Sequence, residues 1–137
     1  EQVDAIRALG ADPVKKLVLP RVAAAVIAMP MLGMFATILG IVGAMVVCAL
    51  QFGIGKEYFF TSALDSLRLS DFFCGLAKTP VFGFIIAIVG CHFGLKTTGG
   101  TEGVGLSTTR SVVVVSTAIL VADFLLTKVF IILGIDA

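Results

Sequence analysis

The chain has 137 residues, of which 58% are hydrophobic and 14% are charged; its formal net charge is +1 and its mean hydropathy is +1.11. Soluble domains carry about 25% charged residues, so this composition excludes an ordinary soluble core and indicates a membrane protein. No basic stripe interleaved with aromatic residues is present, which argues against a nucleic-acid partner. The three cysteines lie in apolar stretches and define no disulfide framework: Cys48, Cys74 and Cys91.

The first 21 residues are polar, with three acidic and four basic side chains. Val3, Ile6 and Leu9 recur every third residue, which predicts a short amphipathic helix. Gly10 follows as a left-handed helix end, and the Asp-Pro pair at 12–13 is typical of the N-cap and first position of a new helix. We therefore expect a helical hairpin on the water side of a membrane.

Three apolar runs long enough to cross a membrane follow, at residues 22–52, 72–95 and 111–135. The first carries no charge over about thirty residues, so a straight helix would be about 45 Å long against a hydrocarbon thickness of about 30 Å. We expect a kink at Pro30 and some tilt to absorb the excess. Three glycines of this run would allow another helix to approach: Gly33, Gly40 and Gly43. Gly90 and Gly94 form a similar, weaker pattern in the second run.

Two polar segments connect these runs. Residues 53–71 place apolar side chains at helical spacing, which predicts a short interfacial helix, with Ser70 or Asp71 capping the helix after it. Residues 96–110 are rich in Gly, Thr and Ser and are expected to form a tight loop. Gly100 and Gly105 have the spacing of a phosphate-binding loop, but the required Lys is missing after them, so we do not expect nucleotide binding.

The distribution of cations predicts the orientation of the chain. Six lie on one side of the three spans and two on the other: Arg7, Lys15, Lys16, Arg21, Lys96 and Arg110, against Lys56 and Arg68. The positive-inside rule then places the N-terminus in the cytoplasm and the C-terminus outside. For a bacterial protein these compartments are the two sides of the inner membrane, with the C-terminus periplasmic.

Two ionisable residues lie inside the predicted spans, Lys78 in the second and Asp123 in the third. Ionisable groups in a bilayer are costly and usually face a protein interior or a wet cavity. Their depths differ by about 9 Å at helical rise, a gap that the lysine stem largely closes. Two interpretations stay open, an ion pair that holds two helices together and a polar contact along a substrate route.

Three stretches resemble the permease subunit of MlaE/YrbE-type ABC transporters, which handle phospholipids and related lipids. They are EQVDAIRALGADPVKKLVLPRVAA, GLAKTPVFGFIIAIVGCHFGL and GGTEGVGLSTTRSVVVVSTAILVADFLLT, and the resemblance covers essentially all 137 residues. It implies an all-α integral membrane fold in which this single permease domain, residues 1–137, corresponds to the last three spans of a longer polypeptide.

The resemblance also implies a mechanism. The opening helix would be a cytoplasmic coupling helix that docks into a separate ABC ATPase subunit, through Glu1, Val3, Asp4, Ile6, Arg7 and Leu9. Lys78 and Asp123 match family positions and become candidates for lipid-pathway or gating groups. Further implied partners are a second permease copy, an MCE-domain lipid-binding protein on the outer side, and membrane lipids. We expect no catalytic residue, metal or cofactor in this chain.

Two other functions are compatible with the residues. An ion-coupled secondary carrier would use Lys78, Asp123 and His92 as a proton relay and would need no ATPase. A non-transporting membrane scaffold would use the two charged residues for stability alone. A separate ATPase that copurifies with the protein, together with lipid, would distinguish the permease from both.

Overall fold

The computed structural model describes residues 2–10 and 12–134, and every regular element in them is helical. Within this part of the chain, three helices are long and apolar enough to cross a membrane, so the predicted all-α fold with three helices of spanning length is confirmed. The elements are α1 (Gln2–Ala8), the π-helical turn η1 (Val14–Val18), α2 (Leu19–Gln51), α3 (Lys56–Ser66), α4 (Leu69–Lys96) and α5 (Gly100–Ile132).

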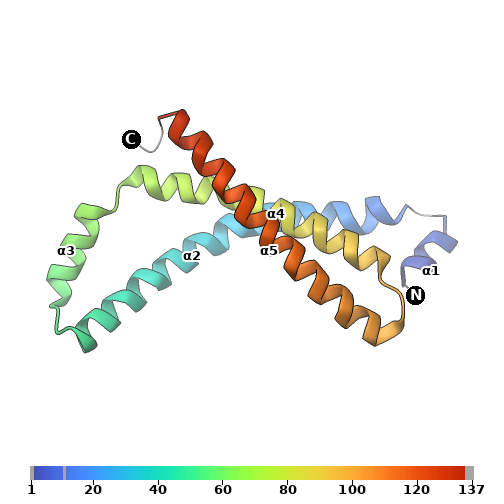
Figure 1. Cartoon of the computed structure of the whole chain (residues 1–137), viewed down its shortest axis with the longest axis horizontal. Helices are drawn as coiled ribbons and strands as arrows, with labels where there is room; N and C mark the ends of the chain where they lie inside the picture. Colours follow the sequence, from blue (N-terminus) through green and yellow to red (C-terminus); the bar gives the residue numbers. More distant parts are fainter. Residues whose placement is uncertain (1, 11, 135–137) are drawn as a thin grey trace.

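Helix α4 is the centre of the arrangement because it packs against both α2 and α5. Figure 1 shows α5 crossing α4 at a wide angle, while α2 and α4 run together near α1 and diverge toward α3. Helix α1 and the α4–α5 turn lie at one end of the molecule, and α3 and the last turn of α5 lie at the other. The two cation-rich segments predicted to share one side therefore do lie at the same end.

The polar opening folds as its residues predict. Gly10 has a φ of 72°, the left-handed conformation that ends a helix. The Asp12 carboxylate then accepts a hydrogen bond of 3.0 Å from the Val14 backbone N–H, which is the action of an N-cap residue. Pro20 has no N–H to donate to the Lys16 carbonyl, and this favours the wider π turn that precedes α2.

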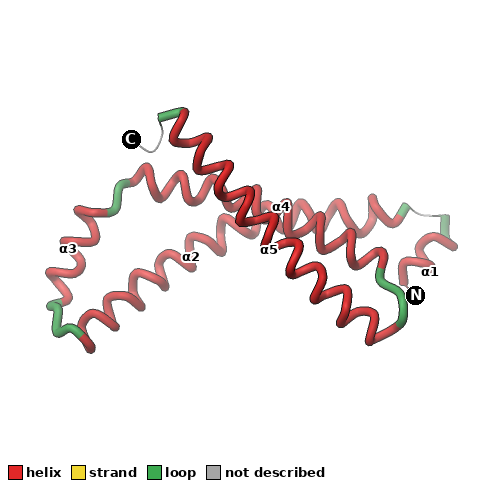
Figure 2. Tube along the Cα trace, viewed as in Figure 1, coloured by secondary structure: helices red, strands yellow, loops and turns green. Residues whose placement is uncertain are grey.

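Helix α2 has 33 residues and contains Pro30 in its interior. Its length at 1.5 Å per residue is about 50 Å, well beyond the hydrocarbon thickness of about 30 Å. Figure 2 shows α2 continuing without a break while its axis changes direction along its length. A proline inside a helix removes one backbone hydrogen bond and crowds the preceding turn, which allows such a change.

The prediction of a loop over residues 96–110 is wrong, because α5 already begins at Gly100. Only a short turn remains, and it reverses at Gly99 with a φ of 89°. The hydroxyls of Thr108 and Thr109 donate to the carbonyls four residues earlier, so these polar side chains are satisfied inside a helix. The glycines at 100–105 thus belong to a helix rather than to a phosphate-cradling loop. The helix that contains the predicted third span consequently begins earlier than residue 111 and ends at Ile132; residue 135 lies outside the described residues.

The cap of the helix that contains the second span also differs from its prediction. Helix α4 begins at Leu69, with Arg68 at the N-cap position and no side-chain hydrogen bond to the cap. Ser70 and Asp71 therefore lie within the first turn instead of capping it. The carboxylate of Asp71 near a helix N-terminus is still favourable, because the helix dipole is positive there.

Close helix packing occurs at a glycine that sequence reasoning did not single out. A Cβ on Gly83 would lie 2.8 Å from the Ala25 carbonyl oxygen of α2, whereas a Cβ on Gly33 would lie 3.3 Å from the Thr79 methyl carbon. Gly40 and Gly43 have no such neighbour within 4 Å, because they lie where α2 and α4 diverge. The Gly90–Gly94 pair also meets nothing within 4 Å, so no helix among the described residues packs closely against these four glycines.

The described residues enclose almost no core. Cys74 is the single buried hydrophobic residue among them, and large apolar side chains cover the outside of all three spans. In water this surface would be untenable, since apolar area is expelled from solvent. In a bilayer the same surface is satisfied by lipid tails or by further helices, which is the environment that the composition predicts.

Candidate functional site

A polar cluster joins α4 to α5 within the membrane-spanning region. Lys78 Nζ lies 3.4 Å from Asp123 Oδ1 and forms an ion pair with it. The lysine is 17% exposed and the aspartate 52% exposed, so the pair sits at the edge of the helix contact. The two intramembrane charges predicted from the sequence to meet do meet, and each lowers the cost of holding the other in an apolar medium.

Two further residues of α5 complete this cluster. Lys78 Nζ donates a hydrogen bond of 2.7 Å to Thr127 Oγ1, and the Thr127 hydroxyl donates one of 2.7 Å to the Asp123 backbone carbonyl. The Lys78 ammonium also lies 5.9 Å from the centre of the Phe130 ring, within cation–π range. The ammonium is therefore held by a charge, a hydroxyl and an aromatic face.

Sequence reasoning missed Thr127 and Phe130, although a signal for both was present. They follow Asp123 by four and seven residues, the spacing that places side chains on one face of a helix. A search for polar and aromatic partners at these positions would have found them. Their presence makes the Lys78 site a four-residue cluster, whose described members come from α4 and α5 alone.

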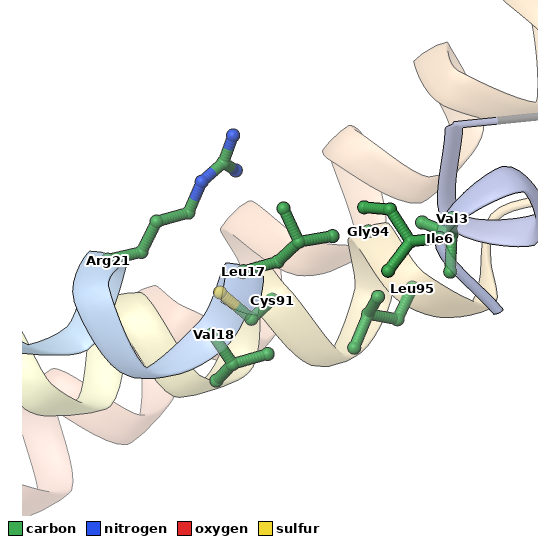
Figure 3. Close-up of a pocket in the computed structure, with 9 residues that line it drawn as sticks. Val3, Ile6, Leu17, Val18, Arg21, Cys91, Gly94 and Leu95 are labelled. Atoms are coloured by element: carbon green, nitrogen blue, oxygen red, sulfur yellow. The ribbon is translucent and has the colours of Figure 1, made fainter. Parts of the chain in front are cut away.

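The candidate coupling residues lie at the other end of α4. Val3 and Ile6 of α1 line a cleft of about 230 Å³ together with residues from the start of α2 and the end of α4. Figure 3 shows both side chains beside Leu95, with Leu17 and Val18 farther along the cleft. Leu9, in contrast, follows α1 in the turn and is 84% exposed. The three apolar residues predicted to share a docking face therefore divide, with two facing this chain and one facing outward.

Other predicted site residues are described only in part. Asp4 and Arg7 lie in α1 by their backbone, but their side chains lie outside the described part of the chain, as does Glu1 altogether. His92 is exposed and its ring makes an edge contact with Phe93. It lies fourteen residues after Lys78 on α4, which is about 21 Å along the helix axis. The structure does not bring His92 to the Lys78–Asp123 pair.

Residues 1–129 match the protein family described as Permease MlaE. The chain belongs to the MlaE permease family. The match includes α1 and the whole Lys78 cluster apart from Phe130. With three apolar helices of spanning length, this MlaE-family chain is a multi-pass membrane protein.

Relatives of this MlaE-family chain come from bacteria and from a plant chloroplast. A probable ABC transporter permease protein of Rickettsia typhi is 41% identical over 93% of this chain and 49% of its own length. A probable ABC transporter permease protein of Synechocystis is 42% identical over 92% of this chain and 48% of its own length. The chloroplast protein of Arabidopsis thaliana named trigalactosyldiacylglycerol 1 is 39% identical over 95% of this chain and 37% of its own length. The chain thus spans about half the length, or less, of these curated relatives.

Proposed function

We propose that this chain is part of the permease subunit of an ABC transporter that moves phospholipid or a related lipid across or out of a membrane. The observation that carries the proposal is the match to the MlaE permease family over residues 1–129. A lipid substrate is supported by the name of the chloroplast relative, which refers to a galactolipid. Because the chain spans about half of its relatives, the proposal concerns the complete protein to which these helices belong.

In this proposal ATP is hydrolysed by a separate ATPase subunit that docks at the end of the molecule carrying α1. The ATPase contacts the exposed Leu9 and the residues Glu1, Asp4 and Arg7. Val3 and Ile6 act from the opposite side of α1, where they line the cleft against α4. The cation distribution supports a cytoplasmic location for this end, with the last residues of the chain on the periplasmic side of a bacterial inner membrane.

The Lys78–Asp123 cluster is the proposed polar point of the lipid route or its gate. A lysine held by an aspartate, a threonine and a phenylalanine can exchange its carboxylate partner for a lipid phosphate, since both are oxygen anions that accept hydrogen bonds from an ammonium. A second permease copy would complete the route, and an MCE-domain protein on the outer side would receive or deliver the lipid.

The test is transport by the complete permease, reconstituted with its ATPase in liposomes that contain a phosphatidylglycerol with a fluorescent acyl chain. We expect ATP to drive lipid movement at least ten times faster than a non-hydrolysable ATP analogue does, with no response to a proton gradient. Movement driven by a proton gradient without the ATPase would support the ion-coupled carrier instead. A complex that assembles but moves no lipid under either condition would support the scaffold.

A further inference from the structure

Polar residues bound the apolar part of α4 and that of α5 at similar lengths. On α4, Asp71 and His92 are 21 residues apart, about 32 Å at helical rise. On α5, Arg110 and Lys128 are 18 residues apart, about 27 Å. Both separations match a hydrocarbon thickness of about 30 Å. The hydrocarbon layer therefore extends between these two pairs of residues.

At the α1 end, this layer stops at the same height on all three long helices. Arg21 of α2 lines a cleft with Gly90 of α4, and Ser111 of α5 lines another cleft with the same glycine. Arg110 directly precedes Ser111, and His92 follows Gly90 by two residues. Arg21, His92 and Arg110 consequently lie within about one helical turn of one another along α4.

The first part of α5 lies beyond this boundary. Residues 100–109 consist mainly of glycine and polar residues, and all of them are helical. They extend α5 by about 15 Å past Arg110. A segment with the composition of a loop is helical here because it continues a membrane helix into the aqueous phase.

The two arginines at the boundary have no anionic partner in the part of the chain that the structure describes. The ion pair found there joins Lys78 to Asp123, and no acidic residue occurs within seven positions of Arg21 or Arg110 in the sequence. Both arginines are exposed, and Figure 3 shows Arg21 extending away from the residues beside it. Two guanidinium groups are thus presented at the height where lipid headgroups lie.

We propose that Arg21 and Arg110 bind the phosphate groups of anionic phospholipids at the α1 end of the membrane-spanning region. A guanidinium donates parallel hydrogen bonds to two oxygens of one phosphate, and its alkyl stem can lie along apolar surface. Anionic lipids attract cations placed just outside a membrane helix. This contact is separate from the Lys78 cluster, because His92 at the boundary lies about 21 Å from Lys78 along α4.

The contact gives α5 a defined depth in the bilayer. Arg110 is held at one surface and Lys128 lies near the other, so a shift along the helix axis in either direction carries one of these charges into hydrocarbon. The inference does not depend on the proposed function. It requires only that the chain is a multi-pass membrane protein, as its family and its three apolar helices indicate.

The first test measures lipid selectivity. The complete permease is reconstituted in phosphatidylcholine bilayers that contain a trace of spin-labelled phosphatidylglycerol or spin-labelled phosphatidylcholine. Electron paramagnetic resonance then gives the fraction of each labelled lipid that the protein holds. We expect the parent protein to prefer phosphatidylglycerol about two-fold, and Arg21→Gln with Arg110→Gln to lose at least half of that preference. Four cations remain on that side against two on the other, so the orientation is kept.

The matched control is Lys56→Gln with Arg68→Gln at the opposite end of the molecule. Each of these cations has an acidic residue within three positions, Glu57 and Asp65, so we expect this variant to keep the preference. Both double variants retain Lys78, and a difference between them cannot arise from it. Equal loss in the two variants, or no preference in the parent, would overturn the proposal.

Two further outcomes identify other ligands for the arginines. If the preference survives in Arg21→Gln with Arg110→Gln, the proposal is overturned, and loss of the ATPase from that variant would then indicate a protein contact. Inorganic phosphate, compared with chloride at equal ionic strength, should leave the preference of the parent unchanged. If phosphate abolishes the preference, the arginines bind a free anion instead of a membrane lipid.

The second test locates the boundary itself. With the native cysteines replaced by alanine, a spin label is attached at Leu106→Cys or at Val113→Cys, both of which are exposed positions on α5 on either side of Arg110. We expect a water-soluble nickel complex to relax the label at residue 106 at least twice as strongly as the label at residue 113, and oxygen to show the reverse. Equal responses would place the boundary away from Arg110 and overturn the proposal.

Failure of this inference is distinguishable from failure of the proposed function. Neither test uses ATP or transport, so a permease that moves no lipid still shows the phosphatidylglycerol preference if the arginines bind it. Conversely, ATP-driven lipid movement by a permease without that preference leaves the proposed function standing and removes the headgroup contact.

Discussion

The two contacts of α4 are built from opposite chemistry. Toward α2, α4 presents Gly83, and the contact depends on the absence of a side chain. Toward α5, it presents Lys78, and the contact depends on a charge, a hydroxyl and an aromatic ring. Shape complementarity in a membrane is insensitive to small changes of charge state, whereas a polar contact in an apolar medium can be broken and remade. In the proposed function, the first contact therefore stays fixed while the second exchanges its partner.

The largest expected effect comes from adding bulk at the first contact. Gly83→Leu forces atoms into the space between Gly83 and Ala25, and overpacking of this kind costs about 3 kcal/mol. A titration from mild detergent into sodium dodecyl sulfate should show the complete protein unfolding at a clearly lower fraction of the denaturing detergent. Gly40→Leu is the control, because its Cβ meets nothing within 4 Å. Equal stability of the two variants would refute the close contact.

Breaking the ion pair should have the next largest effect. Lys78→Met leaves the Asp123 carboxylate without its cation, which costs about 2 kcal/mol in an apolar medium. The double variant Lys78→Met with Asp123→Leu should regain at least half of that loss, because no charge is left unpaired. Lipid transfer separates the two interpretations of the pair. If the pair gates the lipid route, the double variant should transfer no lipid. If the double variant transfers lipid normally, the pair has a structural role alone.

A smaller change should follow removal of the hydroxyl. Thr127→Val deletes the acceptor of the Lys78 hydrogen bond while preserving side-chain shape, and the expected loss of stability is about 1 kcal/mol. Thr127→Ser keeps the hydroxyl and should behave as the parent does. A double-mutant cycle with Lys78→Met measures the coupling between these residues, and a coupling of zero would remove Thr127 from the cluster.

The smallest expected effect lies outside the membrane, at the cap of the helix that leads into α2. Asp12→Ala removes the acceptor for the Val14 N–H and should cost about 0.5 kcal/mol. Hydrogen exchange at the Val14 amide should accelerate roughly two-fold, while Asp12→Asn, which retains an acceptor oxygen, should leave it unchanged. Acceleration by both variants alike would point to the charge of Asp12 instead of its hydrogen bond.

Sequence reasoning succeeded where one physical effect dominates. Long apolar runs favour membrane-spanning helices, and the antiparallel order of two helices brings Lys78 and Asp123 close enough for the lysine stem to bridge the difference in depth. It failed where two effects compete. Residues 100–110 have the composition of a loop, yet their glycines and hydroxyls are also compatible with a helix once the hydroxyls bond to the backbone. The contact at Gly83 and the inward orientation of Val3 depend on how α2 and α4 cross, which no local pattern encodes.

The central claim is that this chain belongs to a permease that obtains its energy from another subunit through the end bearing α1. The most direct measurement is purification of the complete, natively expressed permease in mild detergent, followed by mass spectrometry of bound proteins and lipids. The account predicts an ATP-binding-cassette ATPase in a fixed ratio to the permease, together with bound phospholipid. A permease that is recovered without any ATPase and whose transport follows a proton gradient would contradict it.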